Sequence, residues 1–180
     1  MHGRHHSWPR TWLMTDERMG DRLWEAVARL PDAAGIVFRH YSLPPELRAD
    51  LAARLAEMAD ERGITLAVAR DVELARRVGA ALVHNPACAP ADLPFSLSVH
   101  RLEEAHGARA AGAALVFVSP VRATTSHPGQ PPLGPERAGE IARATGVPAI
   151  ALGGMDAEKF ALLEREGFYG WAGIDAWLRT

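Results

Sequence analysis

Short apolar runs alternate with amphipathic stretches along nearly the whole chain, and this alternation limits the available folds more than any other feature. The apolar runs predict eight β-strands, at residues 12–15, 35–38, 65–69, 81–83, 95–99, 114–118, 148–152 and 169–174. Few of these runs alternate strictly between apolar and polar residues. They are therefore typical of strands that are covered on both faces, as in a parallel sheet.

The stretches between these runs have mostly helical periodicity. Helices are predicted at residues 21–30, 46–62, 71–78, 102–111, 136–145 and 157–166, with a last helical turn at 175–179. In the longest of them, Leu47, Leu51 and Leu55 recur on one face, and Gly63 follows its end. Residues 85–92, which contain two prolines, are predicted to be a loop or a degenerate helix, and residues 120–134 are predicted to be a loop.

Eight strands separated by helices or a loop are the number that closes a parallel barrel. We therefore expect an α/β protein with one compact (β/α)8 TIM barrel at residues 11–180, after a flexible N-terminal tail at residues 1–10. An open doubly wound sheet is the alternative, but no glycine fingerprint follows the first strand. A chain of 180 residues is short for a barrel, so its loops must be short as well.

Charge and cysteine content narrow the surroundings in which the chain acts. A net charge of −2 gives no reason to expect nucleic acid as a partner. The single cysteine, Cys88, excludes an internal disulfide and favours a cytoplasmic protein. No apolar run is long enough to cross a membrane, and residues 1–10 lack the apolar stretch of a signal peptide. The sequence is compatible with a homodimer but does not determine the oligomeric state.

The lysine content bears on the chemistry. Lys159 is the only lysine, and it falls in the helix predicted at residues 157–166 on the outside of the barrel. Schiff-base catalysis requires a desolvated lysine in the site, so this position argues against a lysine-dependent aldolase.

Polar or glycine residues follow nearly every predicted strand. They are Asp16, Arg39, Asp71, His84, His100, Ser119, Gly153, Gly154 and Asp175. Each has a structural alternative: Asp71 is a good helix N-cap, and a single histidine is commonly a structural one. Because barrel active sites lie at the carboxyl ends of the strands, the whole set predicts an active site there.

Three segments suit a phosphate group. Gly153 and Gly154 follow the seventh strand, and Gly170 and Gly173 flank the eighth, where barrels commonly bind phosphate. The loop at residues 124–129 adds hydroxyls and an imidazole, and it is suited to closing over an anion. A tight turn and a solvated polar loop are the simpler explanations of these segments.

The motifs also resemble those of a known family. Residues 119–121, 124, 126–129 and 132–134 are similar to the segment that leads into the flexible loop of thiamine phosphate synthases. Residues 147–155 resemble their seventh strand, and residues 13–16, 80–84 and 98–105 resemble their first, fourth and fifth strands. The chain thus resembles the thiamine phosphate synthase/TenI family from about residue 12 to residue 177.

This resemblance implies a (β/α)8 barrel and one of two reactions. Synthase members join hydroxymethylpyrimidine diphosphate to thiazole phosphate with Mg²⁺ and release pyrophosphate. TenI-type members isomerise a thiazole carboxylate by proton transfer and need no metal. Both imply small phosphorylated substrates.

The resemblance also implies roles for individual residues. The catalytic candidates are Arg39, His100, Ser119, Thr124, Ser126 and His127. The candidates for binding substrate or phosphate are Arg39, Arg70, His84, Gly153, Gly154, Ala172 and Gly173. Asp71 is the candidate ligand of Mg²⁺.

Several family residues are replaced, mainly on the diphosphate side. Val37 and Tyr41 stand where the family has a glutamine and a lysine around Arg39. Arg70 stands in place of an asparagine, His127 in place of the loop lysine, and the second metal-binding aspartate has no clear match. Three hypotheses remain open: a divergent synthase, a TenI-like tautomerase, and a barrel that binds thiazole phosphate without catalysis.

Overall fold

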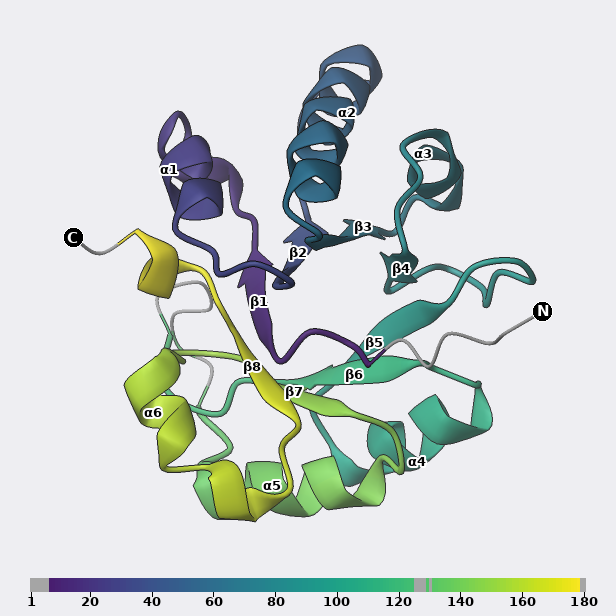
Figure 1. Cartoon of the computed structure of the whole chain (residues 1–180). Helices are drawn as coiled ribbons and strands as arrows, with labels where there is room; N and C mark the ends of the chain where they lie inside the picture. Colours follow the sequence, from purple (N-terminus) through teal and green to yellow (C-terminus); the bar gives the residue numbers. More distant parts are fainter. Residues whose placement is uncertain (1–6, 125–128, 130, 179–180) are drawn as a thin grey trace.

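A computed structural model, which describes residues 7–124, 129 and 131–178, shows a closed parallel barrel. Its eight strands pair in sequence order, and β8 closes the barrel against β1 (Figure 1). The strands are β1 (Thr11–Met14), β2 (Gly35–Phe38), β3 (Thr65–Ala69), β4 (Leu82–His84), β5 (Phe95–Val99), β6 (Leu115–Val118), β7 (Ala149–Ala151) and β8 (Gly170–Gly173). The predicted (β/α)8 barrel is confirmed.

Helices on the outside connect most of the strands. They are α1 (Arg22–Ala28), α2 (Pro45–Glu61), α3 (Val72–Arg77), α4 (Leu102–Ala110), α5 (Pro135–Ala144) and α6 (Ala157–Ala161). Short 3₁₀ turns lie at η1 (Glu17–Met19), η2 (Glu164–Glu166) and η3 (Asp175–Trp177). The predicted helix 157–166 is divided into α6 and η2, because Leu163 and Glu166 donate to carbonyls three residues back.

The segment between β4 and β5 contains no helix. Residues 85–94 pass directly from one strand to the next as a loop, as the prolines predicted (Figure 1). This omission is one way in which the barrel closes with a short chain.

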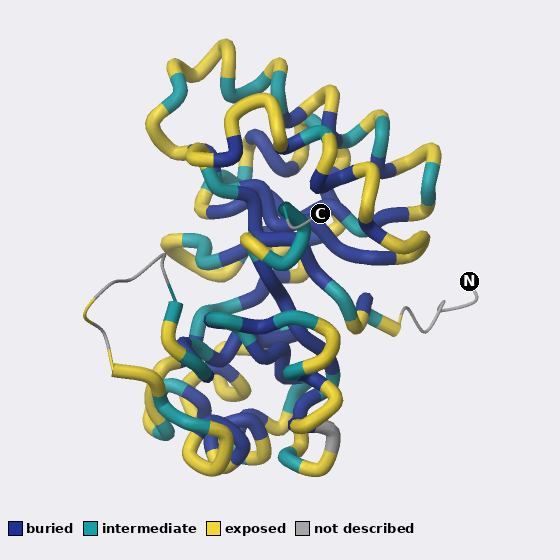
Figure 2. The backbone as a smooth tube through the Cα atoms, turned by 90° about the vertical axis from the view of Figure 1, so that its left-hand side faces the viewer, coloured by how far each residue is buried: buried dark blue, intermediate teal, exposed yellow. Residues whose placement is uncertain are grey.

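The barrel interior is filled by large apolar side chains. Trp12 and Phe117 pack edge to face across it, with 5.6 Å between their ring centroids. A Cβ at Gly35 would lie 2.2 Å from the Trp12 ring, so this glycine makes room for the indole. Figure 2 shows the buried strands at the centre, with exposed residues mainly on the outer helices and loops. The interior is thus a packed core, and the polar ends of the strands are left to form a site.

Residues near both ends of the described chain bind to the barrel. The Tyr169 hydroxyl donates to the Trp8 carbonyl (2.6 Å), and the Trp171 amide donates to the Arg10 carbonyl (2.8 Å). Trp171 stacks on Trp177 at 5.2 Å and belongs to the core. Residues 1–6 of the expected tail lie outside the described residues, so a flexible tail at 1–10 stays a prediction.

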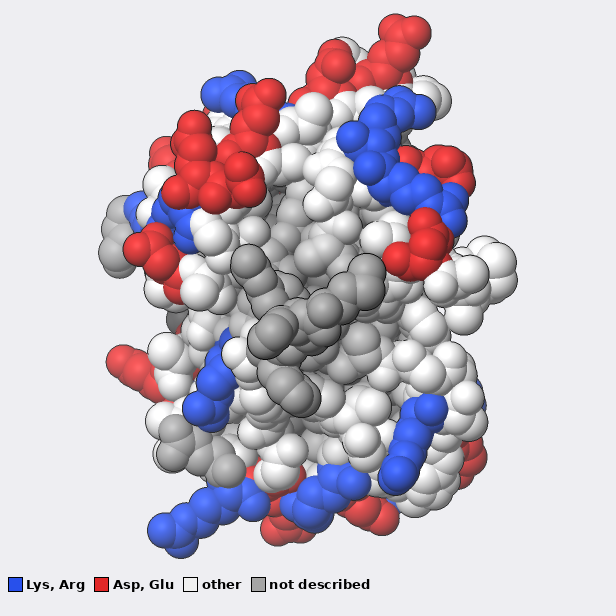
Figure 3. Space-filling view, turned by 45° about the vertical axis from the view of Figure 1, so that its right-hand side comes forward, with Lys and Arg blue, Asp and Glu red and all other residues white. Residues whose placement is uncertain are grey.

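Two surface features bear on partners. In the part of the chain that the structure describes, no helix combines the length and apolarity that a membrane crossing requires. On the face drawn in Figure 3, basic and acidic side chains both occur, and neither sign covers the surface.

Candidate functional site

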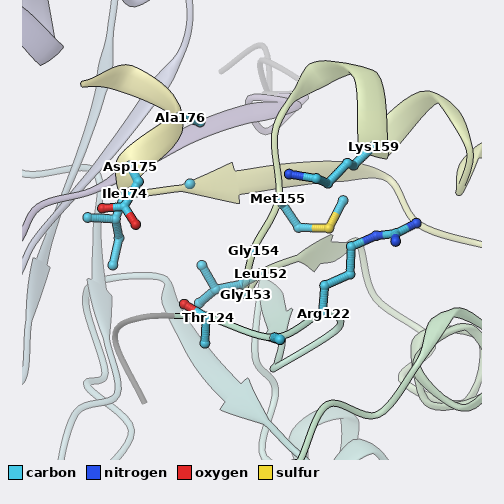
Figure 4. Close-up of a pocket in the computed structure, with 12 residues that line it drawn as sticks. Arg122, Thr124, Leu152, Gly153, Gly154, Met155, Lys159, Ile174, Asp175 and Ala176 are labelled. Atoms are coloured by element: carbon cyan, nitrogen blue, oxygen red, sulfur yellow. The ribbon is translucent and has the colours of Figure 1, made fainter. Parts of the chain in front are cut away.

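A cavity of about 380 Å³ opens at the carboxyl ends of β7 and β8. Three segments contribute most of its lining: residues 122–124 after β6, residues 152–155 after β7 and residues 173–176 from the end of β8 onward (Figure 4). Thr124, Gly153, Gly154 and Gly173, all expected at a phosphate site, lie in these segments. Ala172 does not line the cavity, because its side chain lies in the barrel interior.

The two glycines after β7 allow the segment after β6 to cross directly over them. The Val121 amide donates to the Leu152 carbonyl (2.9 Å), and the Arg122 amide donates to the Gly153 carbonyl (3.1 Å). Gly154 has φ +63°, and a Cβ there would lie 2.4 Å from the Ala123 carbonyl oxygen. The tight-turn explanation of these glycines therefore holds, and the turn itself shapes the cavity.

Two basic side chains that the sequence did not single out as site residues also line this cavity. Lys159 extends from α6 toward the space near Met155, and its ammonium lies 2.6 Å from a carboxylate oxygen of Asp156 (Figure 4). Among the described residues, Arg122 Nε is the only buried side-chain nitrogen or oxygen without a hydrogen-bond partner. The sequence placed Lys159 outside the site; the short turn between β7 and α6 brings it to the rim.

Arg39 occupies the opposite side of the mouth, at the end of β2. Its Nε donates to the Thr15 carbonyl (3.0 Å), and its Nη2 lies 3.8 Å from a carboxylate oxygen of Asp16. Burial lowers the pKa of Arg39 below its ordinary value. The guanidinium, with a side chain only 19% exposed, is thus a positive charge fixed between β1 and β2.

Asp71 caps α3 and pairs with an arginine from α2. Its Oδ1 accepts from the Leu74 amide (2.9 Å), and its Oδ2 accepts from Arg48 Nη1 (2.6 Å). Arg48 also donates to the His40 and Ala69 carbonyls, at 2.7 and 3.0 Å. The N-cap that the sequence predicted as an alternative is confirmed, and a metal would have to compete with Arg48 for the same carboxylate.

The described residues do not fit a Mg²⁺ site. Nowhere in residues 7–124, 129 or 131–178 do three histidine, cysteine, aspartate or glutamate side chains gather as metal ligands. Mg²⁺ bound by protein usually takes one or two free carboxylates together with substrate phosphates. Asp71 is already engaged, and Asp16 is held by Arg18 through two hydrogen bonds of 2.8 and 2.9 Å.

A second cavity, of about 560 Å³, lies between the loops after β2 and β3. Arg70 and Tyr41 line it, and the Arg70 guanidinium lies over the Tyr41 ring at 4.6 Å. Arg70 has φ +67°, and its backbone amide donates to the His84 carbonyl (2.7 Å). The two replacements that the sequence showed here, Tyr41 and Arg70, therefore contact each other.

His84 lies beneath the mouth and is only 2% exposed. Its Nδ1 is 3.0 Å from the Ser96 hydroxyl, and its Nε2 is 3.2 Å from the Asn85 amide nitrogen and 3.3 Å from the Ser98 hydroxyl. Burial, followed by the positive charges of Arg39 and Arg70, lowers the pKa of His84 to about 3. A neutral His84 orders the Ser96 and Ser98 hydroxyls of β5, and its expected contact with substrate stays a prediction.

His100 and Ser119 lie together at the ends of β5 and β6. His100 Nδ1 is 2.7 Å from the Ser119 carbonyl oxygen and 3.4 Å from its hydroxyl. The His100 side chain is exposed to solvent, as proton transfer to a substrate would require. Ser126 and His127, the remaining catalytic candidates, lie outside the described residues.

The sequence comparisons agree on one family. A sequence model described as thiamine monophosphate synthase matches residues 12–177. A putative thiamine-phosphate synthase 2 of Aquifex aeolicus is 38% identical over 81 residues, which are 45% of this chain and 44% of that protein. A thiamine-phosphate synthase of Salinispora tropica is 34% identical over 141 residues, which are 71% of this chain and 66% of that protein.

A solved structure shares the fold. A thiamine phosphate pyrophosphorylase from Pyrococcus furiosus superposes with a TM-score of 0.80 at 24% identity, covering 93% of this chain and 86% of that one. The aligned part spans less than half of the Aquifex protein and just under two thirds of the Salinispora protein. The similarity therefore supports the fold throughout, while the activity has to be argued from the site.

Proposed function

Because the chain belongs to the thiamine monophosphate synthase family, we propose that it joins a pyrimidine diphosphate to a thiazole phosphate. In this reaction the C–O bond to the diphosphate breaks, and its electron pair leaves with pyrophosphate. The thiazole nitrogen supplies the electron pair of the new C–N bond. The protein contributes by holding the two substrates together and by stabilising the charge of the leaving group.

The observation that carries this proposal is the cavity at the ends of β7 and β8. Thr124, Lys159 and Arg122 line it, and among the described residues Arg122 Nε is a buried donor without a partner. The size of the cavity suits a small phosphate ester. A buried donor without an acceptor is costly, and a ligand oxygen would remove that cost. We assign the thiazole phosphate to this cavity.

The leaving group belongs to the opposite side of the mouth. Arg39 is fixed between β1 and β2, and Arg70 lines the cavity beside β3. Charge-assisted hydrogen bonds from arginine to phosphate oxygens are the strong kind, and they act where negative charge develops. Between the two sides, His84 orders the side chains of Asn85 and Ser98.

A coupled assay for thiamine phosphate tests the proposal. The protein is mixed with pyrimidine diphosphate and thiazole phosphate, with Mg²⁺ and with chelator, and product is measured by chromatography. Arg39→Gln should lower kcat/KM by at least about 10-fold, since it removes a charged contact to the leaving group. Absence of product from folded protein that binds both substrates would contradict the proposal.

A tautomerase acting on the thiazole carboxylate is the second candidate, and His100 is the observation that favours it. Its Nδ1 faces the Ser119 carbonyl at 2.7 Å and must donate there, which leaves Nε2 as a base. If the protein is a tautomerase, the same sample incubated with the substrate isomer of the thiazole carboxylate would convert it to the product isomer. His100→Gln should abolish that conversion and leave thiazole phosphate binding intact.

A further inference from the structure

Arg48 holds a largely buried positive charge that depends on Asp71. Its side chain is 11% exposed, its guanidinium lies 5.5 Å from the Phe38 ring centroid, and its Nε and Nη2 donate to carbonyls at the ends of β2 and β3. Among the residues that the structure describes, the Asp71 carboxylate, at 2.6 Å from Nη1, is the ion-pair partner of this charge. A buried arginine whose partner is withdrawn is strongly destabilising, so Asp71 is committed to Arg48.

The other carboxylates on this side of the mouth are engaged as well. Asp16 binds Arg18 through both oxygens, which lowers its pKa. Glu17 accepts hydrogen bonds from the Ser42 amide and hydroxyl. Each of these carboxylates orders a loop, and each would lose that contact on turning toward a metal.

Arg70 has the opposite status. Within the described part of the chain, the Arg70 guanidinium has no hydrogen bond or ion pair, and it lies over the face of Tyr41, 4.6 Å from the ring centroid. Stacking on an aromatic ring leaves the in-plane N–H donors of an arginine available. Both the Arg70 side chain and Tyr41, which is 46% exposed, border the 560 Å³ cavity.

Arg39 and Arg70 act on the same region. Tyr41 lines the 560 Å³ cavity together with Arg70, and it also lines a neighbouring cavity of about 350 Å³ together with Arg39. Burial, followed by the positive charges of Arg39 and Arg70, lowers the pKa of His84, which lies on β4 beneath the mouth. A neutral imidazole adds no charge that would repel or attract an anion there. Two guanidinium groups therefore lie in neighbouring cavities on one side of the mouth, where Asp16, Glu17 and Asp71 are already paired.

We propose that this side of the mouth binds the diphosphate through Arg39 and Arg70, without carboxylate-held Mg²⁺, and that Asp71 instead serves Arg48. This inference rests on the proposed function for the presence of a diphosphate. The inference predicts whether Mg²⁺ raises or lowers the affinity of the protein for diphosphate. Where protein carboxylates hold the metal, Mg²⁺ bridges protein and diphosphate and raises affinity. Where arginines alone bind, Mg²⁺ neutralises the ligand and occupies the oxygens that the arginines need.

Calorimetric titration with inorganic pyrophosphate distinguishes these cases in the full chain, with EDTA or with millimolar Mg²⁺. We expect binding in EDTA that weakens at least about 5-fold with Mg²⁺. Arg70→Gln should weaken the binding in EDTA by about 10- to 100-fold, the range for one charge-assisted contact. Arg54→Gln is the matched control, because Arg54 also stacks on an aromatic ring, Trp24 at 4.0 Å, but lies on α2 outside the cavity.

Each outcome decides the inference. Affinity that rises with Mg²⁺, or no binding in EDTA, would overturn it, and so would an Arg70→Gln variant that binds like Arg54→Gln. The assay for thiamine phosphate answers the other question separately. Pyrophosphate binding that weakens with Mg²⁺ but without product formation supports the arginine site and rejects the synthase. If product forms and the affinity for pyrophosphate rises with Mg²⁺, the arginine site is rejected and the synthase proposal stands.

Discussion

The two sides of the barrel mouth are built by different means. On the β7/β8 side, backbone hydrogen bonds and the positive-φ Gly154 bring two loops together around a cavity. On the β2/β3 side, contacts between side chains shape the site. Arg48 and Asp71 join α2 to the strand ends, and Arg70 stacks on Tyr41. The residues that match the family are mostly on the first side and the replacements mostly on the second. A site shaped by backbone tolerates many neighbouring substitutions, whereas one built from side chains changes its chemistry with each.

The largest loss of stability should come from removing the side-chain contacts on the β2/β3 side. Arg48→Met leaves Asp71 and two carbonyls without their buried donor, so we expect the free energy of unfolding to fall by about 3–5 kcal/mol. Urea denaturation monitored by circular dichroism measures it. Arg54→Met, on the exposed part of α2, should cost less than about 1 kcal/mol. Equal losses in the two variants would contradict the role of Arg48.

The backbone construction is tested by Gly154→Ala. The added Cβ would meet the Ala123 carbonyl oxygen at 2.4 Å in a left-handed backbone conformation, and we expect a loss of about 2–3 kcal/mol. Thiazole phosphate affinity should fall with it, since the cavity loses its shape. Gly79→Ala is the matched control: its φ is +66° but nothing lies within 4 Å of the new Cβ, so about 1 kcal/mol is expected.

His84, between the two sides, predicts a pH dependence. Because its pKa is about 3 in the folded chain and about 6.5 when unfolded, the unfolded state binds more protons between these values. Its contribution to stability is fully present above pH 6.5 and is lost as the pH falls toward 3. His84→Gln should reduce the slope of unfolding free energy against pH in this window by up to about 1.4 kcal/mol per unit. Unchanged slopes would show that His84 is not held neutral.

The smallest expected effect tests whether the charge of Lys159 on the β7/β8 side contributes to phosphate binding. Lys159→Met should weaken the binding of thiazole phosphate about 10-fold. It should leave unchanged the binding of the corresponding thiazole alcohol, which lacks the phosphate group. Stability should change by less than about 1 kcal/mol, because the Lys159–Asp156 pair is partly exposed. An equal loss for both ligands would place Lys159 outside the phosphate site.

Much of the fold was predictable from local pattern. Strands such as 65–69 and 95–99 have the predicted bounds, because apolar runs between turn residues specify a buried strand with little outside information. Boundaries shifted where several geometries satisfy the same pattern, as in 157–166, where i→i+3 bonds end α6 early. Asp71 was predictable as a cap because capping is a contact between near neighbours.

The sequence by itself determined the barrel, the polar strand ends and the glycine turns, since each depends on residues close together in the chain. Only the tertiary structure decided what those residues contact. The pair formed by Arg48 and Asp71, the stack of Arg70 on Tyr41 and the arrival of Lys159 at the β7/β8 cavity each require distances that closure of the barrel sets. The sequence does not show whether a charged side chain is paired within the folded protein or available to bind a ligand. Its partner is chosen by folding, and with it the chemistry that the site can perform.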